Sequence, residues 1–180
     1  YMDLYSRVLM DPSALTAASV NFWIDSMHLW QSAWMKMLGH AAPPVALPAK
    51  GDARFKDEDW SGNFVFDYIK QSYLIAARHI QHAVGGVEGL PEDSQKKIAF
   101  FTRQYVDALA PSNFAATNPQ VLRETMASGG QNLIKGLNNL LADIEKGEGQ
   151  LRISMTDEKA FQLGRNVATT PGKVVYQNAL

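Results

Sequence analysis

His79 and His82 are the first side chains in this sequence whose type and spacing could support chemistry. They lie three residues apart in a segment with helical periodicity, and that spacing can direct two ligands toward one metal ion. No His-Glu-x-x-His pattern supplies a third ligand. We therefore expect surface or interhelical hydrogen-bonding histidines, with neither a metal site nor a bound cofactor.

Nucleophilic catalysis lacks its usual signatures. The 180 residues contain no cysteine, so thiolate chemistry, disulfides and cysteine–metal sites are excluded within this sequence. No Gly-x-Ser-x-Gly elbow is present, and Ser128-Gly129-Gly130 reads as the end of a helix. The glycines at 85, 86 and 89 lack the Gly-Lys-Ser/Thr ending of a phosphate loop. The carboxylates of residues 57–59 are interpreted as a solvated charge run, so no catalytic residue is assigned.

Composition narrows the classes of partner. Hydrophobic residues make up 46% and charged residues 19% of a chain with net charge -1, which is typical of a globular domain. Nucleic acid is not an expected partner, because phosphate neutralisation requires clustered cations. No apolar run is long enough for a membrane span, and no secretory signal is evident. A soluble cytoplasmic protein is expected and, since the chain opens on Tyr1, a piece of something longer.

An aromatic seam dominates the first predicted helix, residues 11–38. Asp11 and Pro12 suit its start and Gly39 its end. Apolar residues recur in steps of three and four, a heptad-type spacing. They are Val20, Trp23, Met27, Trp30, Trp34 and Met37. Tryptophan anchors interfaces and methionine adapts to irregular partners, so Trp23, Met27, Trp30, Trp34 and Met37 are the candidate interface residues. Packing into the protein's own core is an equally weighted alternative.

Residues 41–62 are predicted to be a linker, since they hold three prolines and a charged run. This divides the chain into an amphipathic segment 1–40, a Pro-rich flexible or extended tether 41–62, and a helical domain 63–180. Within the last, helices are expected up to Gly85-Gly86, from Pro91 to Pro111, from Asn118-Pro119 to Gly129, and on to Gly147. Ile98, Phe101, Tyr105 and Leu109 of the second are expected to point inward. The last is expected to bury a stripe, namely Leu133, Leu137, Leu140, Leu141 and Ile144.

The C-terminal part is predicted to change character. Residues 151–155 alternate in polarity like a short strand, residues 156–167 form a helix, and residues 173–176 begin a second strand. A strand without a neighbour needs a partner, which favours a sheet continuing beyond this sequence. The expected fold class is mainly α, a multi-helix domain with an N-terminal amphipathic helix and short strands leading into a missing α/β domain.

Several strings from Arg54 onward resemble the N-terminal region of polyhydroxyalkanoate (poly-beta-hydroxybutyrate) synthases, in order and with matching spacing. These are Arg54-Phe55-Lys56-Asp57 with Trp60-Ser61, Tyr68-Ile69-Lys70-Gln71-Ser72-Tyr73-Leu74, Phe101-Thr102-Arg103-Gln104-Tyr105-Val106-Asp107-Ala108, Ala110-Pro111-Ser112-Asn113-Phe114, Thr117-Asn118-Pro119, Ser128-Gly129-Gly130-Gln131-Asn132-Leu133, Ile153-Ser154-Met155-Thr156-Asp157-Glu158 and Thr169-Thr170-Pro171-Gly172-Lys173-Val174-Val175. Residues 1–50 match only in general character, and the likeness is greatest to class I synthases.

The resemblance implies an acyltransferase that polymerises hydroxyacyl-CoA on an α/β-hydrolase domain, using a cysteine nucleophile that this sequence lacks. For the N-terminal region it implies dimerisation, stabilisation of the catalytic domain, and association with the polymer granule and granule-associated proteins in the cytoplasm. Two further hypotheses remain open at this point: a module that adsorbs directly to the granule surface, and a free-standing helical scaffold.

Overall fold

The computed structural model describes residues 12–87, 90–153, 155–156, 160–167 and 169. Contacts group the chain into two compact units, residues 1–129 and residues 130–180. The described residues form helices and loops without a strand, apart from one isolated bridge between Leu163 and Val167. The mainly α fold class is thereby confirmed.

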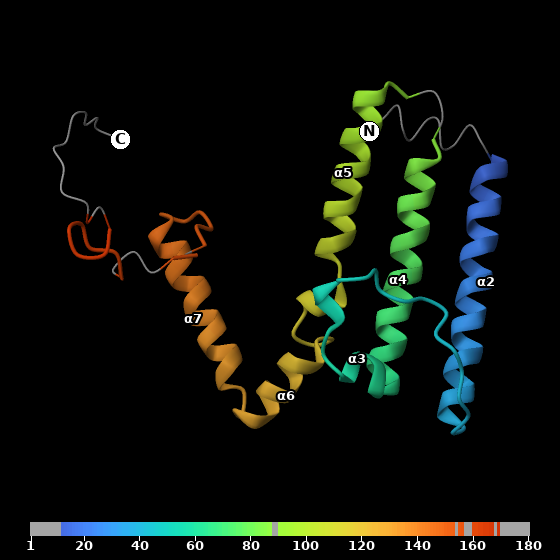
Figure 1. The fold of residues 1–180 in the computed structure, drawn as a ribbon, viewed down its shortest axis with the longest axis horizontal. Coiled ribbons are helices and arrows are strands. Elements are labelled where there is room, and N and C mark those ends of the chain that lie inside the picture. Colours follow the sequence, from blue (N-terminus) through green and yellow to red (C-terminus); the bar gives the residue numbers. More distant parts are fainter. Residues whose placement is uncertain (1–11, 88–89, 154, 157–159, 168, 170–180) are drawn as a thin grey trace. The chain divides into compact units, whose positions relative to one another are not determined.

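Three long helices make up the frame of the first unit: α2 (Pro12–Met37), α4 (Phe64–Gly85) and α5 (Glu92–Ala108). In Figure 1, α4 (green) lies between α2 (blue) and α5 (yellow-green), and each outer helix packs on it. Shorter elements complete the unit: η1 (Ala53–Phe55), α3 (Asp59–Gly62), η2 (Pro111–Asn113) and α6 (Pro119–Ala127). The second unit contains one described helix, α7 (Gln131–Lys146).

Local capping chemistry explains where these helices begin and end. Gly39 has a left-handed φ of 82°, and the next amide N–H donates back to the Met35 carbonyl, which closes α2. The Asn63 side chain accepts from the Val65 amide at the start of α4. At the start of α6, Asn118 caps two amides and Pro119 occupies the first turn.

The core of the first unit lies where α2, α4 and the segment between them meet. Leu29 of α2, Ile75 of α4 and Ala46 form its buried cluster. A second buried group surrounds Trp60 of α3, which is 1% exposed and stacks edge-on against Phe55 at 5.0 Å between ring centroids.

Residues 41–62, predicted to be a tether, are packed against these helices. The amides of Val45 and Ala46 both donate to the buried Gln71 side chain of α4. Phe55 and Trp60, in the same segment, are buried. Residues 41–49 contain no helix or strand but are held against α4, in contrast to the flexible or extended tether that was expected. The boundaries at residues 40 and 62 remain a prediction.

The inward face of α5 differs from the predicted one. Of the four residues expected to point inward, Ile98 is half-buried and Phe101, Tyr105 and Leu109 are exposed, whereas Val106 is buried. The Arg54–Asp107 ion pair and the hydrogen bond from the Tyr73 hydroxyl to the Val106 carbonyl hold the neighbouring side of the helix toward α4. Polar contacts from distant residues therefore set the rotation of α5.

The stripe on α7 that was expected to be buried is not. Leu133, Leu137, Leu140 and Leu141 are exposed and Ile144 is half-buried. The amphipathic pattern correctly predicts a helix with one apolar face. The pattern does not indicate whether the helix or strand that covers this face lies in the same unit.

The C-terminal predictions were wrong wherever the structure describes the residues. Residues 151–153 form no strand, and residues 161–167 form a turn rather than a helix. The Asn166 side chain accepts from the Gln162 amide and donates to the Ala160 carbonyl, contacts that favour the turn over helical pairing. The strand predicted at residues 173–176 lies outside the described residues.

Candidate interaction surface

The outward side of α2 carries all five predicted interface residues. Trp23 is 65% exposed, Met27 60%, Trp30 53%, Trp34 43% and Met37 55%. We call these five side chains the aromatic face. Trp30 and Trp34 contact each other edge to face, with ring centroids 5.7 Å apart. The alternative that this seam packs into the protein's own core does not hold for the unit described, because another side of α2 faces α4.

The inward side of α2 is fixed to α4 partly by apolar packing. Leu29 is 3% exposed, and Phe22 packs against the same cluster and contacts the His79 ring edge-on at 5.7 Å. Ala33 is also buried. This face is narrow and has few large apolar side chains. Polar contacts are therefore needed to hold α2 against α4.

Near its middle, α2 is tied to α4 through Asp25. Its Oδ2 lies 2.7 Å from His79 Nε2 and accepts from the Arg78 guanidinium at 2.8 Å. The hydrogen bond with His79 and the charge of Arg78 together lower the pKa of Asp25 from its ordinary value. His79 is thus an interhelical hydrogen-bonding residue, one of the roles predicted for it. His82 is exposed, and its carbonyl accepts the capping amide of Gly86.

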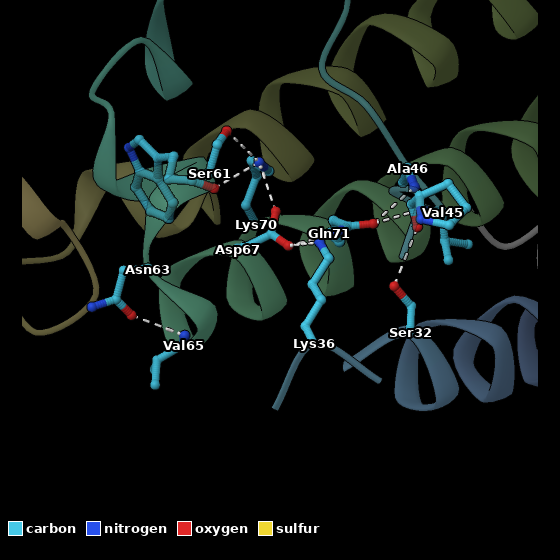
Figure 2. Close-up of polar contacts among 12 residues, drawn as sticks. Ser32, Lys36, Val45, Ala46, Ser61, Asn63, Val65, Asp67, Lys70 and Gln71 are labelled. Carbon is cyan, nitrogen blue, oxygen red and sulfur yellow. Dashed lines mark hydrogen bonds and ion pairs between the residues drawn. The ribbon is translucent and has the colours of Figure 1, made fainter. Parts of the chain in front are cut away.

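Near its C-terminal end, α2 is tied to α4 through a buried charge cluster. Figure 2 shows Lys36, Lys70 and Gln71 converging on Asp67, with Ser32 bonded to the segment that carries Val45 and Ala46. Lys36 Nζ lies 2.7 Å and Lys70 Nζ 2.9 Å from the two Asp67 oxygens. Burial raises the pKa of Asp67, but the hydrogen bonds and charges of the two lysines outweigh it and the net shift is downward.

Lys70 also connects the cluster to α3. Its Nζ donates to the Trp60 carbonyl at 2.6 Å and to the Ser61 hydroxyl at 3.2 Å. With Asp67 it saturates the three donors of the ammonium group, as a buried lysine requires. Sequence reasoning missed this cluster, because buried polar residues at helical spacing look like ordinary surface residues.

The charged part of the predicted linker is likewise structural. Arg54 bridges Asp52, the Tyr73 hydroxyl and Asp107, and its guanidinium lies over the Tyr73 ring. These carboxylates raise the pKa of Arg54, so it stays charged. Arg123 of α6 pairs with Asp57 and Asp59, the residues interpreted as a solvated run. Their partner lies more than sixty residues away in the sequence, and nothing local indicates it.

The described residues contain no group of three or more His, Asp or Glu side chains placed to hold a metal ion. Nor does any helix in the described part of the chain combine the length and apolar character needed to cross a membrane. The 26-residue α2 is long enough, but polar residues interrupt its apolar surface. What the arrangement offers chemically is a hydrophobic surface on a firmly held helix.

Comparison with known proteins places the chain in a family. Residues 51–180 match the family described as Poly-beta-hydroxybutyrate polymerase (PhaC) N-terminus. The Poly(3-hydroxyalkanoate) polymerase of Methylorubrum extorquens is 43% identical over 96% of this chain and 28% of its own length. The corresponding polymerase subunits of Rhizobium meliloti and Cupriavidus necator are 41% and 34% identical over 94% and 98% of this chain.

These relatives are much longer than the chain, which spans 28% of their length. No solved structure matches it. The family match covers α3 to α7, and the similarity to the relatives extends over nearly the whole chain. The chain belongs to the family that forms the N-terminal region of poly-beta-hydroxybutyrate polymerases.

Proposed function

We propose that this chain is the non-catalytic N-terminal domain of a polyhydroxyalkanoate synthase and that it dimerises the enzyme through the aromatic face of α2. The relatives named above are polymerases of 3-hydroxyalkanoates, which supports the parent activity. The absence of cysteine from these 180 residues supports a non-catalytic role, since the nucleophile expected for the family is a cysteine. Stabilisation of the catalytic domain and recruitment to granules in the cytoplasm belong to the same proposal.

The observation that carries the proposal is the exposure of the aromatic face on a helix that is itself firmly anchored. Three tryptophans lie within twelve residues, and each is more than 40% exposed. Together they leave a large apolar surface exposed to water. The ion pairs of Asp25 and Lys36 with α4 keep these side chains outward. A surface held in this way is preorganised for a partner.

A second copy of α2 is the partner that the spacing fits best. Steps of three and four place the five side chains in one seam, the pattern by which two helices pair. A buried tryptophan at such a seam contributes about 2 kcal/mol or more. Removing two of them is therefore expected to dissociate the dimer.

The test is the solution mass by light scattering of the chain and of its Trp23→Ala, Trp30→Ala variant. We expect a dimer that becomes monomeric in the variant, with helical circular dichroism unchanged. The matched control is Phe100→Ala, Phe101→Ala, which removes two exposed aromatic side chains from α5 and should leave the dimer intact. A chain that is monomeric throughout contradicts the dimerisation.

Direct binding to the polymer granule is the second candidate, and the charge of α2 favours it. The charged residues of its described part, Asp25 and Lys36, both pair with α4. The outward side therefore lacks the lysines and arginines that suit an anionic bilayer, whereas a neutral polyester surface needs none. Co-sedimentation of a monomeric chain with poly(3-hydroxybutyrate) particles, lost in the tryptophan variant, would establish this candidate in place of dimerisation.

A further inference from the structure

A second unpartnered apolar surface lies on α7, in the other unit of the chain. Six side chains form it: Leu133, Ile134, Leu137, Leu140, Leu141 and Ile144. The first five are between 43% and 56% exposed, and no residue of α7 is buried. At 3.6 residues per turn all six fall within about a third of the helix circumference. We call them the leucine face.

The amino-acid composition of α7 indicates that the helix is stable only when another surface covers the leucine face. Isolated helices shorter than about 12–15 residues are marginal in water even when rich in alanine, and α7, with 16 residues, is barely longer. Gly136, Asn138 and Asn139 in its middle are weak helix formers. No other helix or strand is described in the unit 130–180. Packing of the leucine face against a partner is what a helix of this sequence requires.

The charge of α7 and the width of the leucine face indicate which class of molecule could cover it. Lys135 and Lys146 are balanced by Asp143 and Glu145, so the helix carries no excess cation for nucleic acid or an anionic bilayer. The face is wider than the two-position seam of a coiled coil and corresponds to a helix packed into a globular core. Its partner is therefore a protein surface broader than one helix.

We infer that the leucine face docks on the remaining part of the same synthase polypeptide, the part that this chain does not span. The inference rests on the proposed function in taking the chain as the N-terminal part of a longer enzyme. Its relatives are more than three times as long as the matched region, so on the proposed function a large further part of the synthase is covalently tethered to α7. Tethering raises the effective concentration of that partner, which favours it over a separate molecule.

The test compares hydrogen exchange of residues 131–146 in the full-length synthase and in the 180-residue chain. We expect about tenfold slower exchange in the full-length protein, because docking suppresses local opening of α7. Leu137→Lys, Leu141→Lys in the full-length protein should restore the fast exchange of the isolated chain, with α4 unaffected. The matched control, Asn138→Lys, Ala142→Lys, adds the same charge at the same spacing beside the face and should keep the slow exchange.

Each other outcome overturns the inference. Equal protection of α7 in both proteins means that the leucine face is covered within the 180 residues or not at all. Protection that rises with the concentration of the isolated chain identifies a second copy as the partner. Slow exchange that survives the leucine variant places the docking surface elsewhere. The first and third outcomes do not alter the mass measurement on the tryptophan variant. In the second, that variant would stay dimeric while Leu137→Lys, Leu141→Lys would not, so the leucine face and the aromatic face are still told apart.

Discussion

At Gln71, a single buried amide pairs with three polar groups, two in the segment before α3 and one on α4 itself. Its carbonyl oxygen accepts from Val45 and Ala46 and its nitrogen donates to Asp67. The side chain is 1% exposed, so no water replaces these partners. Such residues decide whether α2, α4 and the intervening segment form one body.

Replacing Gln71 with leucine should destabilise the chain by about 2–3 kcal/mol, because two backbone N–H groups lose their acceptor in a buried position. Gln81→Leu, at an exposed position of the same helix, should change the free energy of unfolding by less than about 0.5 kcal/mol. Urea denaturation of both variants gives the comparison. Equal effects would show that Gln71 is not buried as described.

The charge cluster predicts a specific pH dependence. The pKa of Asp67 is lower in the folded chain than its unfolded value of about 4, so its contribution to stability is present above pH 4 and lost as the pH falls through the folded value. Asp67→Asn should cost about 3 kcal/mol at pH 7, since Lys70 is left without its carboxylate.

The cost of Asp67→Asn should shrink as the pH falls from about 4 through the lower folded-state pKa, where the carboxyl of the folded chain also takes up its proton. Urea unfolding at intervals from pH 7 to pH 3 measures it. Glu124→Gln, which removes an exposed carboxylate on α6, serves as control and should show no comparable convergence with the wild type. A cost for Asp67→Asn that stays constant over this range would contradict the ionised cluster.

At the scale of elements, sequence reasoning located helix ends well and helix orientations poorly. Gly39, Gly85-Gly86 and Asn118-Pro119 act on backbone groups within a few residues, so these helix ends are readable locally. The rotation of α5 depends on Arg54, fifty-three residues from Asp107. Periodicity detects an apolar face but not what covers it.

For α2 the five predicted seam residues are all exposed, but composition alone could not decide whether they face the core or the solvent. The inward face is sparse, with Leu29 and Ala33 buried beside charged residues, and the more hydrophobic side is outward. The prolines of residues 41–49 suggested a tether. The hydrogen bonds that Gln71 accepts from backbone amides of this segment cannot be read from the sequence. Contacts between distant residues account for most of what was missed.

Neighbouring residues on α2 test its orientation directly. Leu29→Ala should cost about 3 kcal/mol, because it opens a cavity against Ile75. Trp30→Ala should cost less than about 1 kcal/mol despite its larger loss of volume, because the side chain is 53% exposed. Unfolding is measured at dilutions where the midpoint no longer depends on protein concentration. The reverse order of costs would mean that α2 is rotated.

At the scale of the whole molecule, every buried residue in the described part of the chain lies before residue 130. Its ion pairs, including that of Arg123 with Asp57, also lie within residues 1–129. We therefore expect this unit to fold without the second.

A fragment ending at Gly129 should accordingly unfold in one cooperative transition, with a urea midpoint close to that of the complete chain. Circular dichroism and tryptophan fluorescence should give coincident curves, since all four tryptophans lie in this fragment. Residues 63–180 expressed alone are the control, and we expect them to unfold without cooperativity because they lack Leu29, Ala46 and Trp60. A fragment 1–129 that fails to fold would show that the first unit depends on the second.

The central position of α4 has a consequence for how the two outer surfaces can change. In the described part of the chain α2 and α5 each pack chiefly on α4 (Figure 1). Substitutions on their outward sides share few neighbours, so their energetic effects are expected to add with little coupling. Selection can therefore remodel the tryptophans of α2 for one partner and the aromatic residues of α5 for another, each without epistatic constraint from the other.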